Sequence, residues 1–415
     1  MDQVNAYDYE FSSEALLSVD IPPVAAARMH RLPPYLFGRI NALKHSLRQK
    51  GVDVIDLAMG NPNEPTPDLI VDKLREAAGD KRNQRYSASQ GIFNLRREVA
   101  MFYDKLWGVE LDPASEVIAT IGTKEGISHL CLATLGPGDV ALTLTPYFPI
   151  HIYAPVIAGA NVIGVSMMEG DEALLAKISD LCRTVSPRPK LVILNFPHNP
   201  TAHTIEIGFF EEIVKLAKRF GFYVMHDFAY GLTTFDGYKA PSFLQAPGAK
   251  DVGIESLTMS KGYNMAGWRI GFMAGNPDLV HLLAAIKGYY DYGIFQAIQI
   301  ATVIALRHCE EDMQAQAKVY EQRRDVLCEG LTRIGWEVEK PRATMFVWTK
   351  IPEAYRQMGS IEFAMQCLQR AEVAVSPGRG FGEDGEGYLR VALVENEERL
   401  RQAVRQLRRA FPVDG

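Results

Sequence analysis

Short apolar runs alternate with amphipathic segments through the first two thirds of the chain. Each run is five or six residues long and is followed by turn residues, which is typical of buried strands. The runs are 117–121, 140–144, 160–165, 191–196, 222–226, 254–259 and 270–274. Segments between them, such as 124–134 and 209–220, have helical spacing. Nearly continuous apolar strands joined by helices predict an α/β fold, with a mainly parallel sheet that helices cover on both faces.

The pattern changes after residue 276. Long helical patterns at 279–309 and 311–334 lead into a smaller α+β region. The elements expected there are strands at 336–339, 345–350, 373–376 and 388–394, a helix at 361–371, and a last helix that ends near residue 411. Near the N-terminus, 37–49 has the pattern of a helix and 52–58 that of a strand.

These patterns divide the chain into a large and a small domain. We expect residues 61–278 to form the large domain, and residues 279–415 to form linking helices and the small domain. Residues 26–60 would be the N-terminal part of the small domain. Residues 1–25 have an irregular pattern. Segment 31–35 is expected to be extended, because a proline disfavours helix in the residue before it.

Charge and composition exclude several classes of function. The net charge of −6 gives no electrostatic reason to bind nucleic acid or an anionic membrane. No apolar run approaches the roughly 20 residues that span a bilayer, and no basic start of a secretion signal is present. The five cysteines are scattered without CxxC spacing, which indicates reduced thiols in a cytoplasmic protein. No zinc, phosphate-loop or serine-hydrolase motif is present, so no metal site is expected.

The residues that follow run 254–259 are suited to hold an aldehyde and a phosphate. Lys261 comes directly after this run, and Arg269 stands eight residues later, before run 270–274. A buried lysine has a lowered pKa and can form a Schiff base with an aldehyde. An arginine can hold a phosphate through two parallel hydrogen bonds. An aldehyde and a phosphate on one small molecule describe pyridoxal 5′-phosphate (PLP). The alternative is a surface lysine with a structural arginine.

Two further strand ends offer groups for an anion and a flat ring. Ligands of parallel α/β sheets bind beyond the carboxyl ends of the strands. Gly122, Thr123 and Lys124 follow run 117–121 and lead into a helix, whose N-terminus favours negative charge. Tyr147 and Phe148 follow the next run, and an aromatic residue at this strand end could stack on a flat ring. An ordinary helix cap and core packing are the alternatives for these two positions.

Two more strand ends carry an amide and a carboxylate. Asn199 lies between two prolines that fix its backbone. Asp227 follows a buried strand, where a carboxylate is costly unless it is paired, and a protonated pyridine nitrogen would be a suitable partner. Tyr230 could donate its hydroxyl to an oxygen on the same ring. An asparagine–proline turn and a helix-capping aspartate remain open as alternatives.

At these residues the chain resembles the class I (fold type I) PLP-dependent aminotransferases, over nearly all its length from about residue 31 to 411. The matching segments are Gly60-Asn61-Pro62, 86–91, Asn199-Pro200-Thr201, 227–230, 261–271, and Arg390 before Val394-Glu395-Asn396. Segments 31–35, 149–153 and 263–269 look most like the bacterial alanine (glutamate–pyruvate) aminotransferases. The resemblance implies a fold type I transferase, with a large PLP-binding domain and a smaller α+β domain.

The resemblance also implies a role for each residue around the cofactor. Lys261 would be the Schiff-base lysine and the base that carries a proton between the substrate Cα and the cofactor. Asp227 would keep the pyridine nitrogen protonated, which makes the ring an electron sink. Asn199 and Tyr230 would form hydrogen bonds to the phenolic oxygen, and Phe148 would stack on the ring.

Other residues would hold the cofactor phosphate and the substrate carboxylate. Those expected at the phosphate are Gly122, Thr123 and Lys124 through the backbone, and Thr258, its possible substitute Ser260, and Arg269 through side chains. Arg390 would hold the substrate α-carboxylate, with Gly60, Asn199 and Phe148 beside it. From the sequence pattern alone, the favoured interpretation of Arg390 is an arginine of a strand that forms an ion pair in solvent. Tyr86 would reach the phosphate of the other subunit, so the active unit would be a homodimer with shared active sites.

The chain departs from the family pattern at three positions. Phe148 stands where tyrosine or tryptophan is usual, so stacking remains but a hydroxyl contact is lost. His198 stands where serine or asparagine is usual; it would either titrate as a neighbour of the ring or be a surface histidine, and we favour the surface position. Arg379 occupies a loop where small or apolar residues are common. It would either pair with a distal carboxylate of the substrate or face solvent, where Glu383, Asp384 and Glu386 would balance its charge.

The implied reaction is the transfer of an amino group from a small amino acid to a 2-oxo acid. Alanine and 2-oxoglutarate are favoured, because no arginine for a distal carboxylate stands in 287–295. Aspartate, branched-chain and diaminopimelate donors remain open, and so does a PLP-dependent lyase. A non-enzymatic regulator is disfavoured by the short acidic segment before residue 31. The glycine-rich segment 378–387 precedes a strand, so it does not indicate a nicotinamide dehydrogenase.

Overall fold

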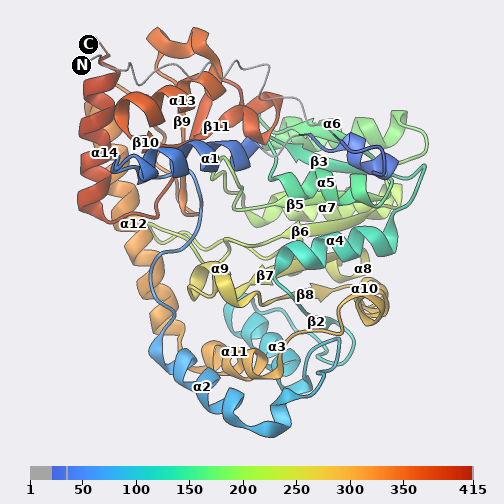
Figure 1. The fold of residues 1–415 in the computed structure, drawn as a ribbon. Helices are drawn as coiled ribbons and strands as arrows, with labels where there is room; N and C mark the ends of the chain where they lie inside the picture. Colours follow the sequence, from blue (N-terminus) through green and yellow to red (C-terminus); the bar gives the residue numbers. More distant parts are fainter. Residues whose placement is uncertain (1–20, 34–35, 414–415) are drawn as a thin grey trace.

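A seven-stranded sheet forms the centre of the protein in the computed structural model, which describes residues 21–33 and 36–413 (Figure 1). Its strand order is β2-β8-β7-β6-β5-β3-β4. The strands are β2 (Val117–Thr120), β3 (Val140–Thr145), β4 (Asn161–Ser166), β5 (Leu191–Asn195), β6 (Tyr223–Asp227), β7 (Gly253–Thr258) and β8 (Gly271–Gly275). Only β8 runs antiparallel to its neighbours. The expected fold class, an α/β fold with a mainly parallel sheet, is confirmed.

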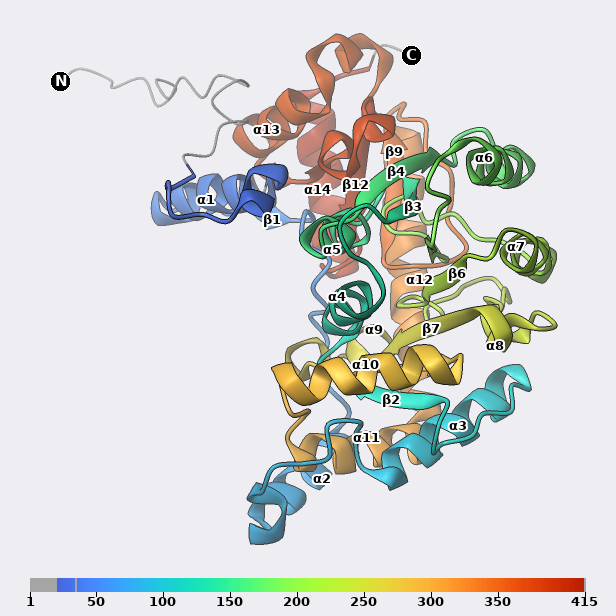
Figure 2. The same cartoon turned by 90° about the vertical axis from the view of Figure 1, so that its right-hand side faces the viewer.

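Helices cover both faces of this sheet, as Figure 2 shows for α4 and α5 on one side and α6 and α7 on the other. Successive side chains of a strand point to opposite faces, so an apolar strand supplies two cores. In β5, Leu191 and Ile193 join one core while Val192 and Leu194 join the other. The helices of this part are α3 (Phe93–Trp107), α4 (Thr123–Thr134), α5 (Pro149–Ile157), α6 (Asp171–Thr184), α7 (Ile207–Phe220), α8 (Ala249–Val252), α9 (Met259–Gly262), α10 (Pro277–Tyr290) and α11 (Gln296–His308).

A smaller α+β part lies beside the large sheet. Its antiparallel sheet has the order β11-β12-β9. Its elements are β9 (Phe346–Lys350), α13 (Gly359–Ala371), β10 (Val373–Ala374), β11 (Ser376–Pro377), β12 (Tyr388–Ala392) and α14 (Glu397–Ala410). Helix α12 (Glu310–Arg333) connects it to α11 along the side of the molecule (Figure 1).

The N-terminal elements between residues 36 and 56 pack on this smaller part, whereas Arg31 of the preceding 3-10 helix donates to the Ala160 carbonyl of the large part at 2.8 Å. Strand β1 (Ile55–Asp56) pairs in parallel with β10, and α1 (Leu36–Gln49) contributes to the same core. Arg399 of α14 forms an ion pair with Asp53 at 2.7 Å. Helix α2 (Asp68–Gly79) lies at the other end of the molecule, against α11. The structure thus brings segment 36–56 together with the C-terminal elements β10 and α14, and the domain boundaries given above remain a prediction.

Several elements differ from the sequence expectations. The helix expected at 279–309 is divided into α10 and α11, because Tyr292 (φ 56°) and Gly293 (φ 95°) adopt left-handed conformations that end a helix. The strand expected at 336–339 is reduced to one bridge between Val338 and Thr349. The strand expected at 373–376 is divided between two sheets, as β10 and β11, and 52–58 shortens to β1.

The start of the chain agrees only in part with its prediction. Arg31 is the last residue of a short 3-10 helix, Ala27–Arg31, whereas Leu32 is extended. Pro34 and Tyr35, and residues 1–20 of the expected irregular segment, lie outside the described residues. No helix within the described residues is both long enough and apolar enough to cross a membrane. All five cysteines are buried, and none is part of a disulfide.

Candidate active site

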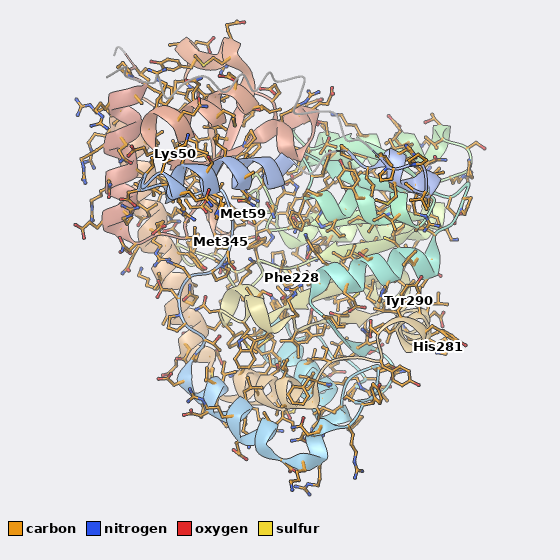
Figure 3. All side chains as sticks on the ribbon, viewed as in Figure 1. Lys50, Met59, Phe228, His281, Tyr290 and Met345 are labelled. Atoms are coloured by element: carbon orange, nitrogen blue, oxygen red, sulfur yellow. The ribbon has the colours of Figure 1, made fainter. Side chains whose placement is uncertain are left out.

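A cleft of about 1090 Å³ lies between the carboxyl ends of the large sheet and the smaller part. Met59, one of its lining residues, marks its position in Figure 3. Twelve of the fifteen residues expected from the sequence line this cleft. They are Gly60, Thr123, Lys124, Phe148, Asn199, Asp227, Tyr230, Thr258, Ser260, Lys261, Arg269 and Arg390. Tyr86, Gly122 and Arg379 are not among its lining residues.

Sheet topology explains why residues so far apart in sequence meet here. Parallel strands end at one edge, so the loops after β5, β6 and β7 place Asn199, Asp227 and Lys261 side by side. The five strand ends are not all neighbours, however, because β8 lies between β2 and β7. Since β8 is antiparallel, its first residues lie at the same edge, and this places Arg269 in the cleft.

Lys261 lies in the one-turn helix α9 directly after β7. Thr258 caps this helix by accepting a hydrogen bond from the Ser260 amide at 3.1 Å. The Lys261 Nζ donates to the Gly60 carbonyl at 2.9 Å. Desolvation in the cleft, followed by the positive charges of Arg390, Arg269 and Lys124, lowers the pKa of Lys261 to about 8. The lysine therefore provides far more neutral amine than an ordinary lysine.

Asp227 is fixed at the end of β6 by three side chains. Its Oδ2 lies 2.9 Å from His151 Nε2, and its Oδ1 accepts from the Ser256 hydroxyl at 3.2 Å. Its carbonyl oxygen accepts from Asn195 Nδ2 at 2.7 Å. Asp227 is buried, so these contacts compensate for the lost hydration of a carboxylate. Its position is suited to a protonated ring nitrogen in the cleft.

The sequence analysis assigned no role to three of these supporting residues. His151 was noted only as part of a segment shared with relatives, and Asn195 and Ser256 were not singled out. His151 lies in the first turn of α5, just beyond the end of β3, and is buried. A histidine in the first turn of the helix that follows a strand end was the available signal that His151 lies at the site. Asn195 and Ser256 lie within apolar runs, where a single polar residue gave no indication of its partner.

Arg390 is held in a fixed orientation at the small-domain side of the cleft. Its Nη1 donates to Asn199 Oδ1 at 2.8 Å, and its Nη2 donates to the Ala58 carbonyl at 3.0 Å. Its guanidinium lies over the rings of Phe346 and Phe381, 4.1 and 4.6 Å from their centroids. A buried, oriented guanidinium of this kind can bind a carboxylate. The alternative of an arginine in a solvent ion pair does not fit its burial.

The loop before α4 is shaped to accept an anion. Gly122 has φ 71°, and a Cβ atom there would lie 2.4 Å from Arg269 Nη2, so the backbone can approach the arginine only because glycine has no side chain. Thr123 begins α4, where unpaired N–H groups favour negative charge. Desolvation and the nearby Arg269 lower the pKa of Lys124. This donor set fits the phosphate of PLP.

Ring and hydroxyl groups complete the cleft. Lys124 Nζ lies 5.0 Å from the centroid of the Phe148 ring, at the entrance to α5. Desolvation raises the pKa of Tyr230, so its phenol stays neutral and can donate a hydrogen bond. The Thr258 hydroxyl donates to Ser260 Oγ at 2.9 Å, so the two hydroxyls lie together. These groups suit a flat, oxygen-bearing ring with a charged arm.

Two of the expected site residues, Tyr86 and Arg379, lie outside the cleft. Tyr86 is 90% exposed, and its ring lies 5.5 Å from that of Tyr292. Arg379 donates to Glu383 Oε1 at 2.7 Å, and both side chains are exposed. Of the two roles considered for Arg379, the structure therefore has the pairing with Glu383.

The interpretation of His198 as a surface residue is wrong. Its side chain is fully buried, and Nδ1 lies 2.7 Å from Thr201 Oγ1. The loop folds back on itself, because the His198 amide donates to the His203 carbonyl at 2.9 Å and the ring packs near Phe196. Burial holds the pKa of His198 well below its usual value, so it is a neutral packing residue.

The sequence of the chain is similar to those of known enzymes. A family model described as "Aminotransferase class I and II" matches residues 52–407. The chain is 50% identical to the glutamate-pyruvate aminotransferase AlaC of Escherichia coli (strain K12), over 94% of each chain. It is 42% identical to an LL-diaminopimelate aminotransferase of Moorella thermoacetica, over 93% of this chain and 98% of the relative.

The fold is also similar to those of solved structures, over nearly the whole length of the chain. The substrate-bound BacF structure from Bacillus subtilis has a TM-score of 0.87 at 30% identity, covering 94% of this chain and 99% of that one. The aspartate aminotransferase from Thermus thermophilus with maleate has a TM-score of 0.85 at 27% identity, covering 93% and 99%.

Proposed function

Because the chain belongs to the class I and II aminotransferases, which are PLP-dependent enzymes of fold type I, we propose that it transfers the amino group of alanine to 2-oxoglutarate. The products would be pyruvate and glutamate. The observation that carries the assignment to this site is that Lys261, Asp227 and Arg390 line one cleft. The choice of alanine is supported by the 50% identity to a glutamate-pyruvate aminotransferase.

Different residues of the cleft would bind different parts of PLP. When bound, PLP supplies an electron sink that stabilises negative charge at the substrate Cα. Its phosphate would be held by Arg269, by the hydroxyls of Thr258 and Ser260, and by the Gly122–Lys124 loop. Asp227 would hold a proton on the ring nitrogen, since its two oxygens are already oriented by His151 and Ser256. Asn199 and Tyr230 would donate to the phenolic oxygen, and Phe148 would cover the ring.

Lys261 would move the proton at the substrate Cα. With a pKa of about 8, about one amine in eleven is neutral at pH 7, against about one in three thousand for an ordinary lysine. Only the neutral amine can act as a nucleophile or a base. The neighbouring cations that keep it neutral also attract the anionic cofactor and substrate. The same charges therefore serve binding and proton transfer.

Arg390 would fix the substrate through its α-carboxylate. The Asn199 and Ala58 contacts orient the guanidinium before any substrate arrives. The Phe346 and Phe381 rings exclude water from its faces and strengthen its attraction for an anion. The substrate Cα would then lie toward Lys261.

The active unit would be a cytoplasmic homodimer. Five large aromatic side chains are exposed in one region of the chain, which is unusual for a free surface. They are Tyr86, Tyr289, Tyr290, Tyr292 and Phe295. A second copy of the chain would cover them, and Tyr86 would reach the phosphate in the partner's cleft. Five buried thiols without disulfides are compatible with a cytoplasmic location.

LL-diaminopimelate is a second candidate substrate, favoured by the outer part of the cleft. Lys44 and Arg48 of α1 line it together with Asp56 and Glu395. The Lys44 Nζ forms an ion pair with Asp56 at 2.5 Å. A side chain that ends in both an ammonium and a carboxylate group would meet opposite charges here, whereas the methyl group of alanine would use none of them.

A donor–acceptor screen tests the proposed reaction. Purified protein with PLP is incubated with pairs of amino acids and 2-oxo acids, and the products are identified by mass. We expect alanine with 2-oxoglutarate to give pyruvate and glutamate, and Lys261→Ala to abolish this turnover. Faster turnover of LL-diaminopimelate would favour the second candidate. Release of ammonia without an acceptor would reject transamination in favour of a lyase.

A further inference from the structure

An ion cluster around one buried lysine lies behind the phosphate loop, outside the cleft. Lys287 of α10 is fully buried, and its Nζ lies 3.0 Å from Glu125 Oε1 and 3.1 Å from each Asp291 carboxylate oxygen. His129 Nδ1 lies 2.5 Å from Glu125 Oε1 and 3.4 Å from Asp291 Oδ2. Ligand atoms of Glu125, His129 and Asp291 all lie within 4.8 Å of one another, a spacing that could hold a cation. The lysine ammonium supplies that cation.

One end of this cluster supports the phosphate loop. While Glu125 Oε1 contacts Lys287, its Oε2 accepts from the Ile121 amide at 2.7 Å. Ile121 immediately precedes Gly122, and Glu125 lies in the first turn of α4 beside Lys124. The Glu125 carboxylate therefore joins the residue before the phosphate loop to Lys287, and Lys287 holds the carboxylate in place.

The other end supports the surface that carries Tyr86. Asp291 ends α10, and its Oδ1 also accepts from the Gly293 amide at 2.8 Å. This holds the left-handed turn at Tyr292 and Gly293, and the Tyr292 ring meets Tyr86. A Cβ atom on Gly293 would lie 3.0 Å from the carbonyl oxygen of Ala88, so the turn packs tightly against the segment after Tyr86.

We propose that Lys287 is a positioning residue that couples the phosphate loop to the Tyr86 surface. It acts through Glu125 and Asp291 and does not touch cofactor or substrate. The proposal rests on the proposed function, in which the loop binds the PLP phosphate and Tyr86 lies at a dimer interface. Its consequence is that PLP binding and self-association depend on each other through one buried ammonium.

The electrostatics explain why this lysine matters more than a surface lysine. Removing one partner of a buried ion pair leaves the other charges uncompensated. Without Lys287, the partly buried carboxylates of Glu125 and Asp291 would remain near each other, with only His129 beside both of them. Their repulsion would move α4 and the turn after α10 apart. The Tyr290 ring, 5.0 Å from His129 and at the outer edge of the molecule in Figure 3, lies beside the same cluster.

The test compares Lys287→Met with Lys218→Met. Lys218 also forms a lysine–aspartate pair, 2.7 Å from Asp251, but on an exposed surface. The PLP dissociation constant is measured by absorbance titration, and the dimer dissociation constant by sedimentation, each with and without PLP. We expect Lys287→Met to weaken PLP binding at least about tenfold, because the Glu125 carboxylate that holds the phosphate loop loses its charged partner. Self-association should weaken as well, and Lys218→Met should change neither constant.

A second variant guards against simple loss of the fold. If Lys287→Met does not fold, Asp291→Asn decides the question, because it keeps the shape of the side chain and removes one charge of the cluster. Coupled weakening of PLP binding and dimerisation supports the proposal. Wild-type values of both constants in the folded variant would overturn it, even if the melting temperature fell. Failure of the wild-type protein to bind PLP would instead reject the proposed function.

Discussion

The charge state of Lys261 is the property on which the reaction depends at the scale of single residues. Its pKa, lowered to about 8 by desolvation and by three cations, should appear as the midpoint of PLP attachment to the apoprotein as pH rises. Removing a positive neighbour makes protonation easier, so Arg390→Gln should move this midpoint to higher pH. Stopped-flow absorbance measures the attachment rate. Arg379→Gln, which changes an exposed arginine paired with Glu383, is the control, and an equal shift in both variants would contradict this account.

His151 should control how tightly the protein holds PLP. Replacing it by leucine leaves Asp227 Oδ2 buried without its donor, which costs roughly 1–3 kcal/mol, or about 5- to 150-fold in PLP affinity. His203→Leu is the matched control, because His203 contacts Asp171 at 2.8 Å in a partly exposed pair outside the cleft. Absorbance titration with PLP measures both variants. Unchanged affinity in His151→Leu would show that Asp227 does not need this support.

The phosphate loop tests the account at the scale of an element. Gly122→Ala introduces both a strained left-handed residue, costing about 1–2 kcal/mol, and a contact with Arg269. Gly138→Ala has the same kind of strain, with φ 93°, but open space around the new Cβ. We expect Gly122→Ala to lose PLP affinity at least tenfold while Gly138→Ala loses only stability. Calorimetry and PLP titration separate the two effects, and equal PLP affinity in the two variants would reject the role of the loop.

Most elements and much of the candidate site could be predicted from local sequence. Buried parallel strands are short apolar runs, and ligands bind beyond their ends, so Asn199, Asp227 and Lys261 could be selected without coordinates. The break between α10 and α11 was missed because it depends on Gly293 meeting the chain near Ala88, far away in sequence. The support of Asp227 by His151 and the burial of His198 also depend on tertiary contacts. No local pattern encodes such contacts.

At the scale of the whole molecule, one side of the cleft is built from segments that lie far apart in the sequence. Arg390 on β12 holds its orientation through Ala58, which follows β1, so N-terminal and C-terminal segments share one side of the site. The exposed aromatic side chains lie outside the cleft, at Tyr86, at the end of α10 and in the segment that leads to α11. In the proposed homodimer, a second copy of the chain would cover these side chains.

Loss of the exposed aromatic side chains should separate the copies. Tyr86→Ala removes a ring that is 90% exposed in one chain, so it should barely change the stability of the monomer. We expect it to weaken dimerisation and PLP retention together, as measured by sedimentation and by PLP titration. Tyr223→Ala, at a partly exposed tyrosine of β6, is the control for loss of a surface ring. A dimer of unchanged strength with unchanged PLP affinity would reject the shared site.

The central claim is that the Lys261 amine binds the aldehyde of PLP. Borohydride reduction of the PLP-saturated protein, followed by proteolysis and mass spectrometry, tests it directly. We predict that the peptide containing Lys261 carries the cofactor mass, in close to one copy per chain. A cofactor mass on another lysine, such as Lys124 in the same cleft, or on no peptide at all, would contradict the account.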